Sequence, residues 1–272
     1  MFLFHIHTKY ISPMELSILD PAKCEQFVSM FQHMNKFTEF INIMCQEERM
    51  YIQCMDPAFV IIFEIILPSS WFSVFTLKNG SITLGVNAAM LYKVLNAYDK
   101  LQSIQLDSTD EVLNIHFIHR DEPNKNVFNK HFEIPLLDVQ TELMEIPEID
   151  HQAELTFPSN IFANLINQLR NFGDTMRVVC SEEKISLESN SIELGKMSVD
   201  VAIDDLQEFV IEEDKTMIVG FSLKYLHDIT SYQKIAKNIF IGMSDNSPLK
   251  ASYDLSDGGT MSFYLAPKVD DD

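Results

Sequence analysis

Two histidines near the start of the chain, His5 and His7, have the spacing that most resembles a metal-binding motif. They alternate along a segment that we expect to be a strand, so both imidazoles would point to the same side and could in principle hold a metal ion. An HxH pair without a third ligand is more often incidental. The acidic run Asp270–Asp272 is typical of a solvated tail rather than of a metal site. We therefore predict no metal site.

The sequence lacks the short motifs of the common enzyme classes. It contains no GxSxG, no HExxH and no glycine-rich phosphate loop, and eight glycines leave little material for such loops. Its cysteines, Cys24, Cys45, Cys54 and Cys180, form no CxxC pair and have no histidine at zinc spacing. We interpret them as reduced, mostly buried thiols of an intracellular protein. We predict that the protein is not an enzyme and has no cofactor.

Length and composition indicate a protein with a sizeable core. The 272 residues, 46% of them hydrophobic, suffice for one large domain or two ordinary ones. The longest apolar run, Phe59–Pro68, is interrupted by Glu64 and is too short to cross a bilayer, and we expect no secretion signal. A net charge of −20 repels nucleic acid at long range, so the positions of the acids matter.

The chain repeats itself at one fixed offset, which places position 180 on position 45. At this offset the segment 45–49 (CQEER) aligns with the segment 180–184 (CSEEK). The same shift pairs further residues, and we expect no gap between them: Phe27 with Phe162, Met34 with Leu169, Phe37 with Phe172, Gly85 with Gly220, Leu91 with Leu226, Ile104 with Ile239 and Asp110 with Asp245. Such a run of matches predicts two copies of one domain.

Each half is predicted to contain a helix, strands, a second helix and further strands, which is an α+β fold. Periodic apolar residues predict helices over 21–36, 87–98, 159–173 and 223–234. The acidic pairs at 47–48 and 182–183 lie between strand-like segments and predict hairpin turns. Prolines bracket residues 134–150, which we expect to be an extended connector. The predicted organisation is an N-terminal extension (1–13), a first domain (14–133), the connector, and a second domain (151–272).

The four predicted helices are poor in acids. They contain only Glu25 and Asp228, whereas the chain as a whole has 40 acids in 272 residues and would place several more in segments of this combined length. The same helices carry six bases: Lys23, Lys36, Lys93, Arg170, Lys224 and Lys234. One explanation is that asparagine-rich helices are simply neutral. We favour a shared surface that faces an anionic partner and touches phosphates without distinguishing bases.

Four short stretches, in this order and spacing, resemble the proliferating cell nuclear antigen clamps of eukaryotes, archaea and some large DNA viruses. They are Gln53–Asp56 (QCMD), Leu84–Asn87 (LGVN), Ile146–Glu148 (IPE) and Tyr264–Lys268 (YLAPK). The similarity extends from about Met14 to the end of the chain. It departs from the family at Glu25, Gln26, Asn164 and Asn167, where members carry bases.

The resemblance implies a head-to-tail homotrimeric ring with helices inside and sheets outside. Such rings encircle double-stranded DNA and act as processivity factors, so we expect the seven DNA-facing bases to be Lys23, Lys36, Lys93, Arg170, Lys224, Lys234 and Lys237. The family joins subunits by pairing edge strands. By position we expect those edges at 112–119 and 184–189, with interface residues Val112, Leu113, Ile115, Phe117, Ile185 and Leu187.

The resemblance also implies a pocket below the connector for peptide motifs of DNA polymerase and other partners. The matching positions are Met55, Phe59, Val60, Ile62, Met144, Ile146, Pro147, Pro248, Tyr264, Leu265, Ala266 and Pro267. Val60 and Ile62 are also typical of ordinary core strands. Met144 lies in an acidic segment, and a flexible thioether suits a surface that accepts several partners.

Three rival functions remain open at this point. An enzyme would turn over a nucleotide substrate. A subunit of a heterotrimeric checkpoint-type clamp would share the fold but not assemble with itself, and an acidic interaction protein would expose acids on its helices. We expect the replicative clamp, loaded by a clamp loader, in the nucleus or in a cytoplasmic replication factory if the protein is viral.

Overall fold

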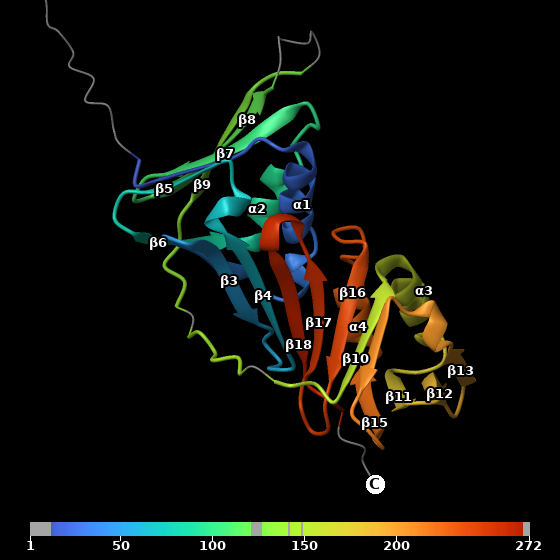
Figure 1. Ribbon diagram of the computed structural model, residues 1–272. Coiled ribbons are helices and arrows are strands. Elements are labelled where there is room, and N and C mark those ends of the chain that lie inside the picture. Colours follow the sequence, from blue (N-terminus) through green and yellow to red (C-terminus); the bar gives the residue numbers. More distant parts are fainter. Residues whose placement is uncertain (1–11, 121–126, 141, 148, 269–272) are drawn as a thin grey trace, which may run out of the picture.

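The computed structural model describes residues 12–120, 127–140, 142–147 and 149–268. It contains four α-helices, α1 (Pro21–Phe31), α2 (Ala88–Leu95), α3 (Ser159–Leu169) and α4 (Leu223–Thr230) (Figure 1). The strands of the first half are β1 (Met14–Ile18), β2 (Phe40–Gln46), β3 (Arg49–Met55), β4 (Ile61–Pro68), β5 (Val74–Leu77), β6 (Ser81–Asn87), β7 (Gln102–Ser108), β8 (Val112–His119) and β9 (Lys130–Pro135). Those of the second half are β10 (Ala153–Pro158), β11 (Thr175–Ser181), β12 (Ile185–Ser191), β13 (Gly195–Val201), β14 (Glu208–Ile211), β15 (Thr216–Ser222), β16 (Asn238–Met243), β17 (Leu249–Asp254) and β18 (Thr260–Leu265). None of the helices in the described ranges is long and apolar enough to span a membrane.

The two halves build the same pair of antiparallel sheets. The first half forms β5-β1-β7-β8-β9 and β6-β2-β3-β4, and the second forms β14-β10-β16-β17-β18 and β15-β11-β12-β13 in the corresponding orders. Among the described strands, one pairing joins the sheets of the two halves, because β4 pairs with β18 and so creates one sheet of nine strands. The predicted α+β fold with an internal repeat is confirmed.

The predicted repeat holds through the end of the first helix in each half. Strands β2 and β11 begin at Phe40 and Thr175, as the offset of the repeat requires. At the same offset the Phe37 amide donates to the Met34 carbonyl (3.0 Å), and the Phe172 amide donates to the Leu169 carbonyl (3.0 Å). Met34 and Leu169 are both fully buried, as their pairing predicts. Helix α1 begins earlier than α3 relative to this offset, so the difference between the halves lies before the paired residues.

Local signals explain where the helices begin. The Asp20 carboxylate accepts a hydrogen bond from the Lys23 amide (2.9 Å) and Pro21 occupies the first turn of α1. The Asn87 side chain caps α2 by accepting from the Met90 amide (2.9 Å). All four helices end several residues before the predicted boundaries. The predicted turns at 47–48 and 182–183 are confirmed, because they link β2 to β3 and β11 to β12.

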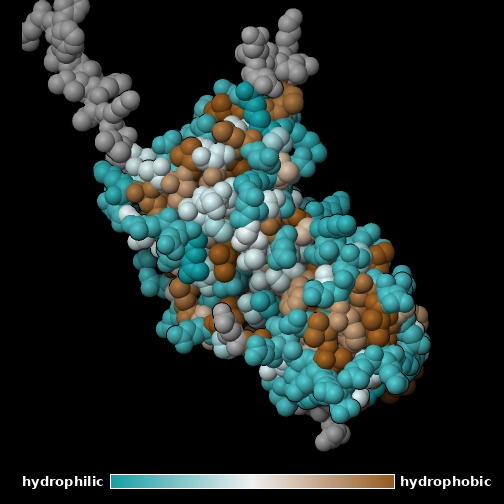
Figure 2. Space-filling view, in the orientation of Figure 1, coloured by the Kyte–Doolittle hydropathy of each residue, from teal (hydrophilic) through white to brown (hydrophobic). Residues whose placement is uncertain are grey.

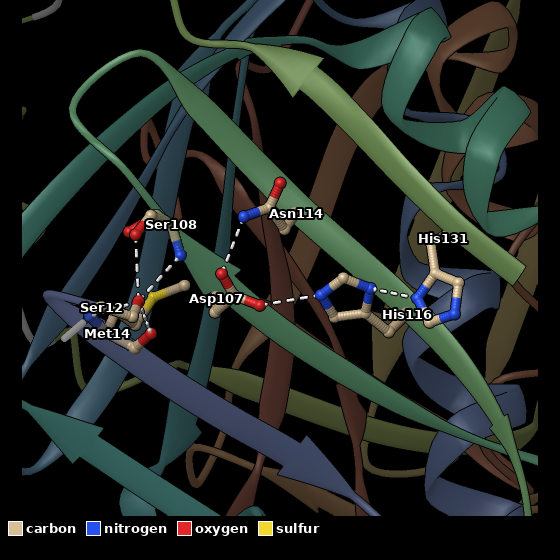
Figure 3. A network of polar contacts seen from close by, with 7 residues as sticks. All are labelled: Ser12, Met14, Asp107, Ser108, Asn114, His116 and His131. Carbon is tan, nitrogen blue, oxygen red and sulfur yellow. Dashed lines mark hydrogen bonds and ion pairs between the residues drawn. The ribbon is translucent and has the colours of Figure 1, made fainter. Parts of the chain in front are cut away.

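The core of each half lies between its helices and sheets. Strand β4 shows the pattern clearly, since Ile61, Phe63, Ile65 and Leu67 are buried and the residues between them are half-buried. All four cysteines are buried free thiols, as predicted. The Ser12 hydroxyl links the start of β1 to the end of β7, because its oxygen lies 2.6 Å from the Met14 carbonyl oxygen and 2.9 Å from the Ser108 carbonyl oxygen and accepts from the Ser108 amide (3.2 Å) (Figure 3). Ser12 thus contacts the first sheet, while residues 1–11, with His5 and His7, lie outside the described residues.

The connector runs from residue 136 to residue 152, between β9 and β10, and its described part contains neither helix nor strand. It crosses the edge of β6, where the Leu137 amide donates to the Gly85 carbonyl (2.9 Å). A side chain at Gly85 would place its first carbon 2.1 Å from the Leu137 carbonyl oxygen. Glycine in the LGVN stretch is therefore required by the close approach of the connector.

Candidate functional site

The helices of both halves form one surface, which we call the helix surface. In Figure 1 the pairs α1–α2 and α3–α4 lie on the same side of the chain. Both acids on these helices are neutralised, Glu25 by Lys100 (3.0 Å) and Asp228 by Lys36 (3.1 Å). Four exposed bases on or next to the helices have no ion pair within the described ranges: Lys93, Arg170, Lys224 and Lys234. The helix surface therefore carries residual positive charge on a strongly acidic protein.

The other three predicted DNA-facing bases differ from these four in their surroundings. Lys23 is largely covered, donates to the Trp71 carbonyl (2.7 Å) and pairs with Asp257, so its ammonium already has partners within the fold. Lys36 is shared between Asp228 and the Ser231 hydroxyl (2.9 Å). Lys237 is exposed at the junction of the halves, beside the outer face of the nine-stranded sheet. Lys36 therefore bridges the segment after α1 to α4. The DNA contacts of these three bases stay predictions.

Two histidines lie where the helices of the two halves meet. His33, after α1, packs edge-on against the ring of Tyr232 (5.5 Å), and the His227 Nδ1 lies 2.9 Å from the Asn167 side-chain oxygen. The pKa of His33 is lowered mainly by burial and, to a smaller extent, by the charge of Lys36. The pKa of His227 is lowered mainly by burial and, to a smaller extent, by the charge of Arg170. Both imidazoles are therefore neutral near pH 7 and add no charge to the helix surface there.

A second site lies beneath the connector, on the outer face of the nine-stranded sheet. A pocket of about 510 Å³, which we call the connector pocket, brings together four of the predicted residues: Ile146, Pro147, Pro248 and Tyr264. Residues that the sequence did not suggest also line it: Glu64, Ile149, Asp150, His151, Glu154, Phe240 and Lys250. Of these, Glu64 had a visible signal, because it interrupts an apolar run on the outward side of β4.

The connector is held over this pocket by Gln53 of β3. The buried Gln53 amide accepts from the Met144 backbone N–H (2.7 Å) and donates to the Met144 carbonyl (2.9 Å). The amide also donates to the Tyr51 hydroxyl (3.0 Å), which donates to Glu64 (2.7 Å). Burial and the nearby Glu64 carboxylate raise the pKa of Tyr264 to about 12. The Met144 side chain itself is 45% exposed, so it is available to a ligand.

The other predicted pocket residues surround the site at different depths. Phe59 is 79% exposed on the β3–β4 turn and has a left-handed backbone (φ 58°). The Asp56 carboxylate stabilises this turn by accepting from the amides of Val60 (2.8 Å) and Ile61 (2.9 Å) and from the Tyr225 hydroxyl (2.8 Å). Met55, Val60, Ile62, Ala266 and Pro267 are half-buried. Leu265 is fully buried and faces the core, so its predicted place in the pocket is wrong.

The predicted edge strands are wrong by one strand in each half. Strand β8 pairs with both β7 and β9, and β12 pairs with both β11 and β13, so neither is an edge. The proposed interface residues Leu113, Ile115, Phe117, Ile185 and Leu187 are buried in the core, and Val112 is paired within the sheet. Among the described strands, the outermost ones next to these are β9 and β13.

The two outer strands lie at opposite ends of the molecule, β9 in the upper-left sheet and β13 in the lower-right lobe (Figure 1). Figure 2 shows apolar side chains gathered on that lower-right lobe amid hydrophilic surface. Exposed apolar residues of the lobe include Ile192, Leu194 and Ile218. Such exposure is typical of a surface that another protein covers.

Comparison with known proteins agrees with this architecture. Residues 23–143 match the family model for the proliferating cell nuclear antigen N-terminal domain, and residues 145–268 match the model for its C-terminal domain. A crystal structure of a PCNA2–PCNA3 complex from Sulfolobus tokodaii has the same fold, with a TM-score of 0.81 and 19% sequence identity over 94% of this chain and 99% of that chain. The helix surface, the connector pocket and the duplicated sheets thus belong to a member of the proliferating cell nuclear antigen family of sliding clamps.

Proposed function

We propose that this chain is the subunit of a ring that encircles duplex DNA without sequence specificity and tethers replication proteins to it. The observation that carries the proposal is the junction inside the chain, where β4 of the first half pairs with β18 of the second. Strand β13 holds the place of β4 in the second half, and β9 holds the place of β18 in the first. A second copy can repeat the same junction by pairing these strands.

Repetition of one junction explains why a closed assembly is expected. A head-to-tail contact generates a ring when its rotation closes and a filament when it does not. If the contact between chains repeats the junction within the chain, it would relate neighbouring halves by the same rotation. The family resemblance sets the expected number at three copies, hence six similar domains around the opening.

The helix surface is the part of the ring that we propose to face DNA. Exposed bases at Lys93, Arg170, Lys224 and Lys234 would meet phosphates, while the neutral polar residues between them carry no strong preference for a base. Few phosphate contacts mean weak binding with a shallow dependence on salt, which suits sliding. No chemical step is involved, because a closed ring retains its partner topologically.

The connector pocket is the proposed docking site for DNA polymerase, for other proteins with clamp-binding peptides and for a clamp loader. Its apolar members, Ile146, Pro147 and Tyr264, would receive aliphatic or aromatic anchors. Acids at Glu64, Asp150 and Glu154 outnumber the single lysine, Lys250, around the pocket. A peptide with apolar anchors and basic flanking residues fits this arrangement best.

Solution mass is the first test of the proposal. We expect light scattering to give three times 31.3 kDa across a dilution series. A persistent monomer would contradict self-assembly. It would favour the second candidate function, which is a subunit of a clamp built from different chains. The similar structure from Sulfolobus tokodaii supports this alternative, because it is a complex of two different proteins.

DNA contact is tested by charge reversal on the helix surface. The triple variant Lys93→Glu/Arg170→Glu/Lys224→Glu should lose most affinity for a short duplex at low salt, because each base contributes a phosphate contact. Lys78→Glu, an exposed base on the turn after β5, is the matched control and should bind like the wild type. Equal affinity of the two variants would refute the proposed surface.

A further inference from the structure

We infer that two copies of this chain meet in one defined register, in which Glu133 of β9 lies directly opposite Lys196 of β13 in the next copy. This inference rests on the proposed function, since it presumes that the chain assembles with itself. It adds the alignment of the two strands and the side chains that determine it.

The junction inside the chain provides the template. On the core face of that junction Phe63 of β4 lies opposite Phe263 of β18, and on the outer face Ile62 lies opposite Tyr264. Both rows continue from one half to the other without a break. Any junction built on the same plan must join core face to core face, because a slip of one residue would turn every side chain to the wrong side.

Registers within the sheets transfer this template to β13. In the first half Ile65 of β4 lies opposite Ile52 of β3, and in the second half Val199 of β13 lies opposite Leu187 of β12. Ile52 and Leu187 are equivalent in the repeat, so their partners Ile65 and Val199 are equivalent as well. Counting back along both strands, Ile62 corresponds to Lys196.

The same comparison transfers the template to β9. Ile134 lies opposite Leu113 of β8, and Leu265 of β18 lies opposite Leu249 of β17. These pairs make Ile134 equivalent to Leu265, so the residue before each of them is also equivalent. Tyr264 therefore corresponds to Glu133, which brings Glu133 opposite Lys196 of the next copy.

The core faces agree with this alignment. Phe132, which takes the position of Phe263, would lie opposite Met197 of β13, and both side chains are only half-buried in the single chain. Phe132 already packs edge-on against the buried Phe117 ring (5.6 Å). Pairing would complete the burial of both residues and continue the row of aromatic and apolar side chains, as Phe63 and Phe263 do at the internal junction (6.4 Å).

The outer faces supply the charge that selects the register. His131 is turned toward β8, where its Nδ1 lies 2.8 Å from that of His116, and His116 in turn contacts Asp107 (2.8 Å) (Figure 3). Within the described residues Glu133 has no ion pair, whereas the ammonium of Lys130, at the start of this strand, donates to the Ala97 carbonyl. Lys196, exposed on β13 and paired with Glu188 (3.0 Å), can bridge both acids. A slip of two residues would bring Glu133 opposite Ser198 and forfeit this contact.

Cysteine pairs test the register directly. Opposite residues of antiparallel strands have Cα atoms about 4.5–5.5 Å apart, within the range of a disulfide. A slip of two residues adds a shift of about 6.8 Å along the strand, which exceeds that range. The test variant is Glu133→Cys/Lys196→Cys. Its matched controls are Glu133→Cys/Ser198→Cys and His131→Cys/Lys196→Cys, which report the two neighbouring registers on the same face, and the four native cysteines are buried.

We expect oxidation of the test variant to remove the monomer band from a non-reducing gel, and the two controls to stay largely monomeric. Faster cross-linking in either control would overturn the register. Absence of cross-links in all three variants, with a wild-type mass of a trimer, would overturn the pairing of β9 with β13 but leave the ring standing. A wild-type monomer would instead refute the proposed function and this inference together.

Discussion

Replacing Gln53 by methionine should release the connector from the sheet. Methionine keeps the length of the side chain but removes the amide that bonds both the N–H and the carbonyl of Met144. Two hydrogen bonds at about 1 kcal/mol each amount to about 2 kcal/mol, or roughly a 30-fold rise in the local opening of the connector. The effect should be confined to this region, because the fold retains its apolar core.

Amide hydrogen exchange provides the assay. The Met144 N–H should exchange about 30-fold faster in Gln53→Met, and affinity for a clamp-binding peptide should fall by up to the same factor, since the peptide must then order the connector. Gln140→Met is the control, because Gln140 lies on the connector and, within the part of the chain that the structure describes, its side chain bonds Asp138 alone (2.8 Å). Unchanged exchange at Met144 would refute the idea that Gln53 holds the connector.

Three further perturbations have defined outcomes. Met144→Ala should weaken peptide binding by about 1 kcal/mol or more without altering the solution mass, as titration calorimetry and light scattering would show. Tyr225→Phe removes a hydrogen bond to the buried Asp56 carboxylate and should lower the melting temperature by about 4–8 °C, from roughly 2 kcal/mol. Because the folded-state pKa values of His33 and His227 are lowered, the unfolded chain binds more protons near pH 6.5, and stability falls as the pH drops through that value. His33→Gln/His227→Gln should show a smaller loss of urea midpoint between pH 7.5 and 5.5, and an equal loss would contradict this assignment.

The repeat and the turns could be predicted from the sequence because they depend on local patterns. An acidic pair between two strand-like segments has one common structural meaning, and both pairs form turns. The edge strands could not be predicted in this way. Alternating apolar residues, as in β8, show which face of a strand is buried but not how many neighbours the strand has. The true outer strand, β9, is short and more polar, and its pattern is correspondingly weak.

The residues of the candidate site could be predicted from their place in the sequence, but the hydrogen bonds between residues far apart in the sequence could not. Ile146, Pro147, Pro248 and Tyr264 line one pocket, and its role in binding partners stays a prediction. The role of Gln53 could not be foreseen, because its partner Met144 is far away in the sequence and nothing local marks the contact. Lys23 shows the same limit, because no local pattern indicates that its ammonium contacts the Trp71 carbonyl and Asp257.

The pairing of β4 with β18 also affects how the chain folds while it is being synthesised. Strand β4 is complete at Pro68, whereas β18 begins only at Thr260, so the edge of β4 has no partner while most of the second half is being made. During that interval the open edge of a strand with alternating Ile and Phe side chains is exposed to other nascent chains. Completion of the first half therefore waits for the last strand of the second, and slow translation of that region should favour aggregation over folding.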